Sequence, residues 1–224
     1  MAGTNGDFPD RSSALSPGSS TSVWYAAYGS NMHPARLASY LEGGVPPGGA
    51  RAHPGCRDAR PPRRSTALTL PGLLYFATES AVWTGGRAFY DPHAPGETAA
   101  HAHLVTLGQL SDIAAQEMGR APGADLDLTA VLRTGRARLG PGRYETLVCA
   151  GTLDGHPVLT FTAPWRSVSV PWNAPAAAYL RHLGGGLRAA HGWGAARAGD
   201  YLASRPGARG HWAAHEVAAL LNAA

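Results

Sequence analysis

The sequence predicts one α+β domain with a barrel-like mixed sheet, a short helix inserted among the strands and a layer of helices at the carboxy-terminal end. Three observations support this prediction. Short apolar runs separated by Gly, Pro and Asp turns occupy residues 23–162, as expected for strands. Apolar residues at helical spacing follow after residue 173. With 224 residues, 44% of them apolar, the chain suits a single core.

The amino-terminal segment differs from the rest of the chain in composition. Residues 1–22 are mostly Gly, Ser, Thr, Pro and Asp, which bury too little surface to offset the entropy of ordering. We therefore expect a disordered tail there and a single domain over residues 23–224. Because no run of about 18 to 20 apolar residues and no signal-peptide pattern is present, we expect a cytoplasmic protein without a membrane partner.

The first ordered segment combines a strand, a polar turn and a helix. The apolar run at residues 23–28 predicts a buried strand, and the Gly-Ser-Asn sequence at 29–31 ends it. Gly29 permits unusual backbone angles in this turn. Pro34 can open a helix that runs to about Leu41.

The remaining strands follow an irregular connection. Residues 44–62 are rich in Gly and Pro and predict this connection. Turns between the later apolar runs indicate short strands of a barrel-like sheet. These strands are expected at residues 65–70, 73–77, 87–90, 102–107, 144–152 and 157–162, with an Asp-Gly hairpin turn at 154–155.

A short helix is expected at residues 110–119, among the strands. Ser111 is the predicted N-cap, Asp112 lies in the predicted first turn and Gly119 is the predicted end.

The helical pattern after residue 173 predicts a helical extension over residues 173–224, packed on the sheet. Asn173 can cap a helix that starts near Pro175, and further helices are expected at 195–203 and 211–222. The apolar face of the first of these helices contains Tyr179, Leu180, Leu183 and Leu187.

Two features are candidates for chemistry. Glu117 lies four residues after Ile113, so its side chain shares the helix face that points to the core. Burial there would raise the pKa of the carboxyl group toward the range of a general base; alternatively, Glu117 lies at the rim of the apolar stripe and reaches solvent. The turn at 29–31 offers backbone N–H groups to a carboxylate or an oxyanion, or it is a purely structural turn.

The order of these motifs resembles the gamma-glutamylcyclotransferase-like family. The sequence Tyr-Ala-Ala-Tyr-Gly-Ser-Asn-Met at 25–32 is similar to the family signature Tyr-x-x-Tyr-Gly-Ser-Asn. Residues 83–88 look like the Gly-Gly turn of the family, and Gln116-Glu117 looks like the end of its catalytic helix. Residues 159–164 resemble its strand with an aromatic pocket wall. The resemblance covers roughly residues 23–192.

The resemblance implies an enzyme that releases 5-oxoproline and a free amine from a small gamma-glutamyl amide. The α-amine of the substrate would attack its own gamma-carbonyl, with Glu117 as general base and acid and with no metal or organic cofactor. Phe161, where family members often carry a tyrosine, would line the pocket. The glutamyl group would be held by Tyr25, Ala26, Ala27, Tyr28, Gly29, Ser30 and Asn31.

Other function classes were weighed against this one. A non-catalytic protein, or a maturation protein that holds a peptide or natural-product intermediate, could use the same fold. Removal of a gamma-glutamyl protecting group from a biosynthetic intermediate would be the same chemistry on another leaving amine. A metal-dependent amide hydrolase such as a deacetylase is less favoured, because the histidine pairs 101/103 and 211/215 lack a third ligand at a recognisable spacing. Glu79 could lie at the pocket rim and recognise substrate.

Composition disfavours several partners. The formal charge of +4 comes with scattered arginines and no lysine, a bias typical of a GC-rich bacterial coding sequence, and the basic cluster at 60–64 has no aromatic neighbours. We therefore expect no nucleic-acid partner. Cys56 and Cys149 lack a CxxC spacing and are expected to be free thiols.

Overall fold

The computed structural model of the protein describes residues 21–46, 49 and 52–223. The predicted tail at residues 1–22 lies outside the described residues up to position 20, and Ser22 already belongs to the first strand.

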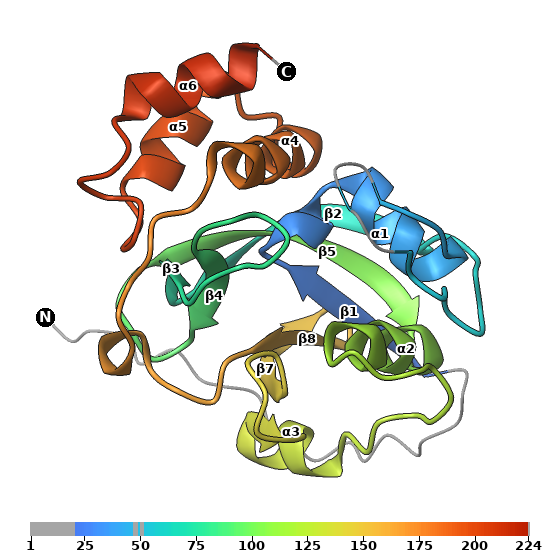
Figure 1. Ribbon diagram of the computed structural model, residues 1–224. Helices are drawn as coiled ribbons and strands as arrows, with labels where there is room; N and C mark the ends of the chain where they lie inside the picture. The colour runs from blue at the N-terminus through green and yellow to red at the C-terminus, as the bar shows by residue number, and fades with distance from the viewer. Residues whose placement is uncertain (1–20, 47–48, 50–51, 224) are drawn as a thin grey trace, which may run out of the picture.

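The described residues form a six-stranded mixed sheet with the strand order β2-β5-β1-β8-β7-β6 (Figure 1). The central strand β1 is antiparallel to β5 and parallel to β8. The predicted α+β class with a mixed sheet is confirmed. The strands are β1 (Ser22–Ala27), β2 (Arg64–Pro71), β5 (Glu97–Thr106), β6 (Arg136–Arg138), β7 (Thr146–Leu153) and β8 (His156–Thr162).

A separate two-stranded ribbon, β3 (Leu73–Ala77) and β4 (Arg87–Asp91), joins the sheet through hydrogen bonds. The hydroxyl of Thr162 on β8 donates to the carbonyl of Tyr90 and accepts from its N–H. On the other strand, the N–H of Phe76 donates to the carbonyl of Pro206. The predicted barrel-like arrangement therefore consists of a sheet and a ribbon, and the ribbon is held at both strands.

Helices lie on two sides of the sheet. In Figure 1, α4, α5 and α6 are grouped above the sheet, and α2 and α3 lie below it. α4 contacts β5 and β2, and α5 and α6 pack on each other and on α4, so the predicted carboxy-terminal helical layer is confirmed. The helices are α1 (Pro34–Glu42), α2 (Leu107–Glu117), α3 (Thr129–Thr134), α4 (Ala177–His191), α5 (Ala195–Ala203) and α6 (Ala214–Asn222), with 3-10 turns η1 (Ser30–Met32) and η2 (Ser167–Ser169).

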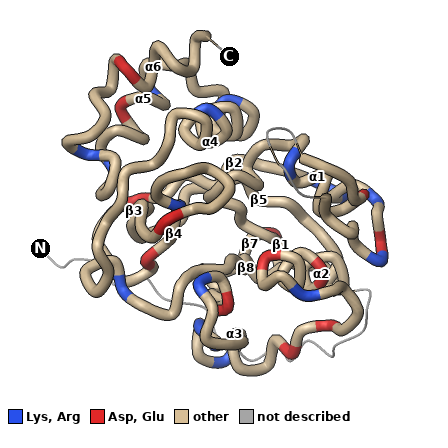
Figure 2. The backbone as a smooth tube through the Cα atoms, viewed as in Figure 1, with Lys and Arg blue, Asp and Glu red and all other residues tan. Residues whose placement is uncertain are grey.

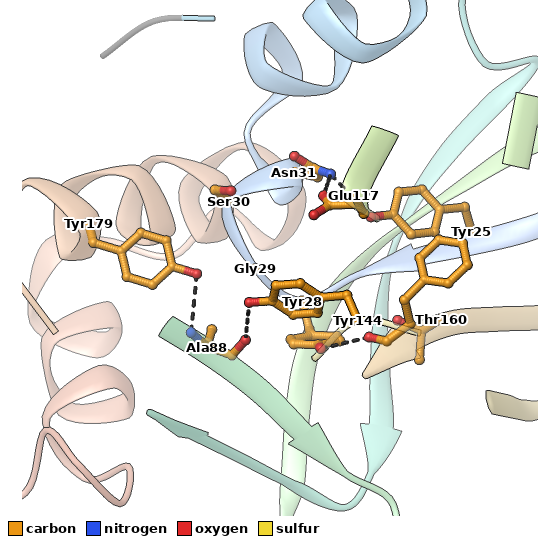
Figure 3. Close-up of a pocket in the computed structure, with 11 residues that line it drawn as sticks. Tyr25, Tyr28, Gly29, Ser30, Asn31, Ala88, Glu117, Tyr144, Thr160 and Tyr179 are labelled. Atoms are coloured by element: carbon orange, nitrogen blue, oxygen red, sulfur yellow. Dashed lines mark hydrogen bonds between the residues drawn. The ribbon is translucent and has the colours of Figure 1, made fainter. Parts of the chain in front are cut away.

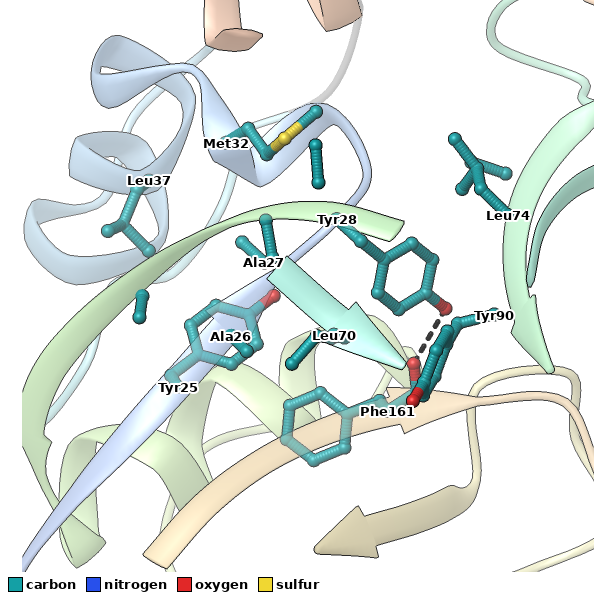
Figure 4. Packing of buried hydrophobic residues seen from close by; sticks show 14 of the residues in the cluster. Tyr25, Ala26, Ala27, Tyr28, Met32, Leu37, Leu70, Leu74, Tyr90 and Phe161 are labelled. Carbon is teal, nitrogen blue, oxygen red and sulfur yellow. Dashed lines mark hydrogen bonds between the residues drawn. The ribbon is translucent and has the colours of Figure 1, made fainter. Parts of the chain in front are cut away.

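The core is built around β1. All six of its residues are buried, so its side chains are covered on both faces of the sheet, which explains the apolar run that follows Ser22. Figure 4 shows how Tyr25 and Tyr28 extend from β1 and from the residue after it into this core. Their rings lie 5.7 Å from those of Phe161 and Tyr90, respectively. Aromatic packing thus fixes the strand end from which the Gly-Ser-Asn turn departs.

The start of α2 differs from the prediction. The side chain of Thr106 accepts from the N–H of Gln109 at 3.1 Å, and Gln109 accepts from the N–H of Thr106 at 3.0 Å, so this capping box begins the helix earlier. The expectation that Ser111 caps the helix and that Asp112 lies in its first turn is wrong. Asp112 is buried and accepts from Arg57 at 3.0 Å, whereas Gly119, at φ +70°, follows the helix end as predicted.

Charged side chains are distributed over several elements rather than gathered on one (Figure 2). Cys56 and Cys149 are free thiols, as predicted. Within the described ranges, no helix has the length and apolar character needed to cross a membrane.

Candidate active site

A pocket opens at the end of β1, where the chain turns into η1 (Figure 3). The volume of the pocket, including the solvent-filled space at its opening, is about 420 Å³. Six parts of the chain meet there: the end of β1 with its turn, β4, α2, the segment before β7, β8 and α4. The lining residues are Tyr25, Tyr28, Gly29, Ser30, Asn31, Ala88, Glu117, Tyr144, Thr160, Phe161 and Tyr179.

Glu117 is the last residue of α2, and its carboxyl group lies in this pocket. Asn31 Nδ2 donates to Glu117 Oε1 at 2.9 Å and to the hydroxyl of Tyr25 at 3.3 Å. Tyr40 also hydrogen-bonds the Glu117 side chain. Of the two alternatives for Glu117, the core-facing side chain is therefore correct, and the pocket gives access to it.

Burial is the main cause that raises the pKa of Glu117 above its ordinary value. Hydrogen bonds from Tyr40 and Asn31 and the charge of Arg36 lower this pKa, but only in part. Glu117 also lies at the C-terminus of α2, where the helix dipole places partial negative charge, and this charge disfavours ionisation of the side chain. A carboxyl group in this state can accept a proton near neutral pH and return it.

Tyrosine hydroxyls anchor the walls of the pocket to the backbone. Tyr28 donates to the carbonyl of Phe161 at 2.7 Å, and Tyr144 donates to the carbonyl of Ala88 at 3.0 Å. The hydroxyl of Tyr179 accepts from the N–H of Ala88 at 3.3 Å. Burial raises the pKa of Tyr179 to about 12, and burial together with the charge of Glu117 raises the pKa of Tyr25, so both hydroxyls stay protonated at neutral pH.

Most of the site residues expected from the sequence meet in this pocket. Ala26 and Ala27 do not line it, because they are buried within β1, where the hydroxyl of Thr160 donates to the carbonyl of Ala26 at 2.7 Å. Those that do line it are Tyr25, Tyr28, Gly29, Ser30, Asn31, Glu117 and Phe161.

Gly29 does not use the unusual backbone angles that a glycine permits. Its φ of −102° and ψ of −150° are extended values open to other residues. A methyl group added there would lie 3.6 Å from the hydroxyl of Tyr179, inside the pocket. The glycine therefore leaves space for a ligand rather than relieving strain.

Four lining residues were not anticipated as site residues. Tyr179 was assigned to the apolar face of its helix, and Ala88 belonged to the motif at 83–88 without an assigned role. Thr160 belonged to the motif at 159–164, also without an assigned role. Tyr144 had no signal of its own, because only tertiary packing brings it to the pocket. Glu79, considered for the rim, does not line the pocket; its carboxylate accepts from Asn173 at 2.6 Å.

The histidines form pairs without further ligands. The rings of His101 and His103 lie 4.1 Å apart, and burial together with the neighbouring His101 lowers the pKa of His103 to about 3. Among the residues that the structure describes, no group of three or more His, Cys, Asp or Glu side chains could hold a metal ion.

Fold and site together define an α+β protein whose polar pocket contains a single carboxylate, held by an asparagine and surrounded by tyrosines. No family model matches the chain. Solved structures that align with it include an uncharacterized human protein, loc79017 (16% identity, 90% of this chain and 98% of that chain, TM-score 0.49), a gamma-glutamyl cyclotransferase (13%, 91% and 99%, 0.48) and YkqA from Bacillus subtilis (16%, 83% and 55%, 0.46).

These structures include a gamma-glutamyl cyclotransferase, the class that the motifs at 25–32 and 116–117 resemble. With TM-scores below 0.5, the alignments support no argument about chemistry, which rests on the pocket itself. A curated protein, Histone deacetylase 5 from Arabidopsis thaliana, is 35% identical over an alignment of 183 residues, and the match covers 74% of this chain. The matched region spans only 28% of the length of that protein.

Proposed function

We propose that the protein is a cofactor-independent enzyme of the gamma-glutamylcyclotransferase type. The observation that carries the proposal is Glu117: it is the one carboxylate among the pocket-lining residues, its pKa is raised by burial, and Asn31 holds it beside the turn at 29–31. The substrate is a small gamma-glutamyl amide, and the products are 5-oxoproline and a free amine.

The reaction requires little of the protein beyond folding the substrate and moving protons. The α-amine attacks the gamma-carbonyl and closes a five-membered ring, so the nucleophile belongs to the substrate and its effective concentration is high. Glu117 takes a proton from the α-ammonium group and returns one to the leaving amine as the amide bond breaks. A carboxyl group with a raised pKa is suited to both transfers.

The turn at 29–31 is suited to stabilise the negative charge that develops on the carbonyl oxygen during the attack. Gly29 and Ser30 line the pocket next to Asn31. In this proposal their main-chain N–H groups stabilise the charge that develops on the gamma-carbonyl oxygen. One well-placed donor of this kind contributes about 3 kcal/mol in other acyl transfers. Phe161 and Tyr25 would pack against the methylene groups of the glutamyl chain.

Metal-dependent deacetylation is not favoured by these residues. The name of the Arabidopsis relative belongs to a much longer protein, and the described residues here contain no group that could serve as a metal-ligand set. The free thiols Cys56 and Cys149 are consistent with the reducing cytoplasm in which we expect the enzyme to act.

The proposal is tested by incubating the protein with a panel of gamma-glutamyl dipeptides and gamma-glutamyl amines and measuring 5-oxoproline by mass spectrometry. Glu117→Gln keeps the shape of the side chain but removes the base, so turnover should fall by about 100-fold or more. Glu79→Gln is the matched control, since Glu79 lies outside the lining of the pocket, and it should retain activity. Absence of 5-oxoproline from every substrate with the wild-type protein would leave the maturation or binding role as the better hypothesis.

A further inference from the structure

Arg36, on the first turn of α1, is buried without a partner for its charge. The residue is 7% exposed, and its Nε and Nη1 atoms are buried and make no hydrogen bond. Among the described residues Arg36 takes part in no ion pair. Burying a cation with unsatisfied donors is costly, so a protein keeps one where a ligand supplies the missing acceptors.

The position of Arg36 connects it to the pocket. Its guanidinium group lies 5.3 Å from the ring centroid of Trp83, and Trp83 stacks at 5.4 Å on the pocket-lining Tyr179. The charge of Arg36 also lowers the pKa of both Glu117 and Tyr179. Arg36 therefore lies close to the proton-transferring carboxyl group as well as to the aromatic wall.

The other titratable groups near Arg36 do not balance its charge. Burial and the charge of Arg36 lower the pKa of His33, and the same causes with the neighbouring His33 lower the pKa of His182 to about 4. Both imidazoles are neutral at pH 7. Glu117 is the nearby acid, but among the described residues Arg36 and Glu117 form no ion pair.

A second buried group in the same region lacks a hydrogen-bond partner, but it is an acceptor rather than a donor. Asn31 Oδ1 is buried without a hydrogen-bond donor, although Nδ2 of the same side chain binds Glu117 and Tyr25. The region thus offers unfilled donors on Arg36 and an unfilled acceptor on Asn31. A zwitterion with an ammonium group and a carboxylate on one carbon would satisfy both.

We propose that Arg36 binds the α-carboxylate of the gamma-glutamyl group, while Asn31 Oδ1 and Glu117 receive its α-ammonium group. This inference rests on the proposed function and narrows its substrates. It restricts them to gamma-glutamyl compounds in which both α-groups are free, so a glutamine side chain within a protein is excluded. Arg36 is then a residue that determines specificity, separate from the proton transfers at Glu117.

The test compares two substrates that differ only at the α-carboxyl group. One is a gamma-glutamyl amine with a free α-carboxylate, and the other is its α-carboxamide, which keeps the α-amine and can still cyclise. The wild-type enzyme should prefer the acid by about 10- to 100-fold in kcat/KM, the range expected for losing charge-assisted hydrogen bonds. In Arg36→Gln this preference should disappear, mainly through an increased KM for the acid.

Arg197→Gln is the matched control, because Arg197 also lies over a tryptophan ring, 4.3 Å from the centroid of Trp193, but in the carboxy-terminal helices. It should keep the preference for the acid. Thermal unfolding provides the readout that separates binding from structure. Arg36→Gln removes an unpaired buried cation and should keep or raise the Tm, whereas a structural arginine would lower it.

The possible failures are distinguishable. If wild type turns over neither substrate, the proposed function is wrong. Calorimetry then compares the affinity for 5-oxoproline with the affinity for its carboxamide, in wild type and in Arg36→Gln. A preference for 5-oxoproline that is present in wild type and absent from Arg36→Gln would still show that Arg36 binds a carboxylate, and no such difference would overturn the assignment. If wild type turns over both substrates equally, or if Arg36→Gln slows both by the same factor, the assignment of Arg36 is overturned while the proposed function stands.

Discussion

At the scale of single residues, the pocket and the side chains around it combine groups that would be unfavourable in an ordinary core. A carboxyl group with a raised pKa, an arginine without an acid and an asparagine with an unused oxygen lie close together. Such groups cluster where function rather than stability selects them. Replacing any one of them is therefore expected to lower activity while keeping or raising the stability of the fold.

Glu117→Gln should stabilise the protein at neutral pH. Below its ordinary pKa of 4.5, Glu117 is protonated in both the folded and the unfolded state and contributes nothing to the pH dependence. As the pH rises from there through the raised pKa of the folded state, the unfolded state ionises first and the fold loses stability. The free energy of unfolding in urea, compared at pH 4 and pH 7.5, should thus favour Glu117→Gln only at the higher pH.

Glu79→Gln is the control for this measurement, because Glu79 lies outside the lining of the pocket and should show no such gain. A lower free energy of unfolding for Glu117→Gln than for wild type at pH 7.5 would mean that the ionised carboxylate is held by its neighbours, contrary to the raised pKa.

At the scale of elements, the sequence predicts best where local signals decide the structure. The strand at 23–28, the hairpin around Asp154-Gly155 and α5 follow the prediction within about a residue. β5 begins at Glu97 instead of 102, because its first half contains small residues buried on both faces and lacks alternation. α3 and β6 were missed, since each is too short to show a period.

The site was predictable only in part, for a related reason. Residues 25–31 and Glu117 lie in local motifs, and they could be found from the sequence. Tyr144 and Tyr179 line the pocket, and Arg36 lies behind its aromatic wall, from elements whose relative positions depend on tertiary packing. Their residue types also have ordinary core or surface explanations, so no local pattern distinguishes them.

Three consecutive glycines, residues 184–186 of α4, let this helix pack closely against neighbouring elements, including the turn η1 at the pocket. A methyl group on Gly186 would lie 2.5 Å from Cβ of Met32 and 3.1 Å from the N–H of His33, so η1 would have to move. Because η1 carries Ser30 and Asn31 into the pocket, Gly186→Ala should reduce turnover by about 10-fold or more and destabilise the fold by about 1–3 kcal/mol, as overpacking does. The assay is 5-oxoproline formation together with thermal unfolding.

Gly184→Ala provides the matched comparison in the same helix. Its methyl group would meet the end of the Leu221 side chain on α6, which can rotate away, and the gain in helix propensity of about 1 kcal/mol offsets part of the cost. This variant should remain active. Equal losses of activity in the two variants would indicate that α4 as a whole, and not its contact with η1, controls the pocket.

At the scale of the whole molecule, the carboxy-terminal helices are joined to the sheet and the ribbon by polar contacts as well as by the core. The N–H of Ala99 on β5 donates to the hydroxyl of Tyr201 on α5 at 2.9 Å. The carbonyl of Pro206 accepts from Phe76 on β3 at 2.8 Å, and Trp212 Nε1 donates to the carbonyl of Pro175 at 2.8 Å. The segment after α4 therefore completes the edge of the ribbon that carries Ala88.

We expect a chain that ends at Gly194, without α5 and α6, to lose both its cooperative unfolding transition and its turnover, although no residue beyond 194 lines the pocket. The truncation leaves the N–H groups of Phe76 and Ala99 without their acceptors and exposes apolar residues of α4, including Leu183 and Leu187. Circular dichroism during heating and 5-oxoproline formation measure the two effects. A truncated chain that unfolds cooperatively and keeps full turnover would show instead that residues up to 194 form a self-sufficient domain, with the last helices as an addition to it.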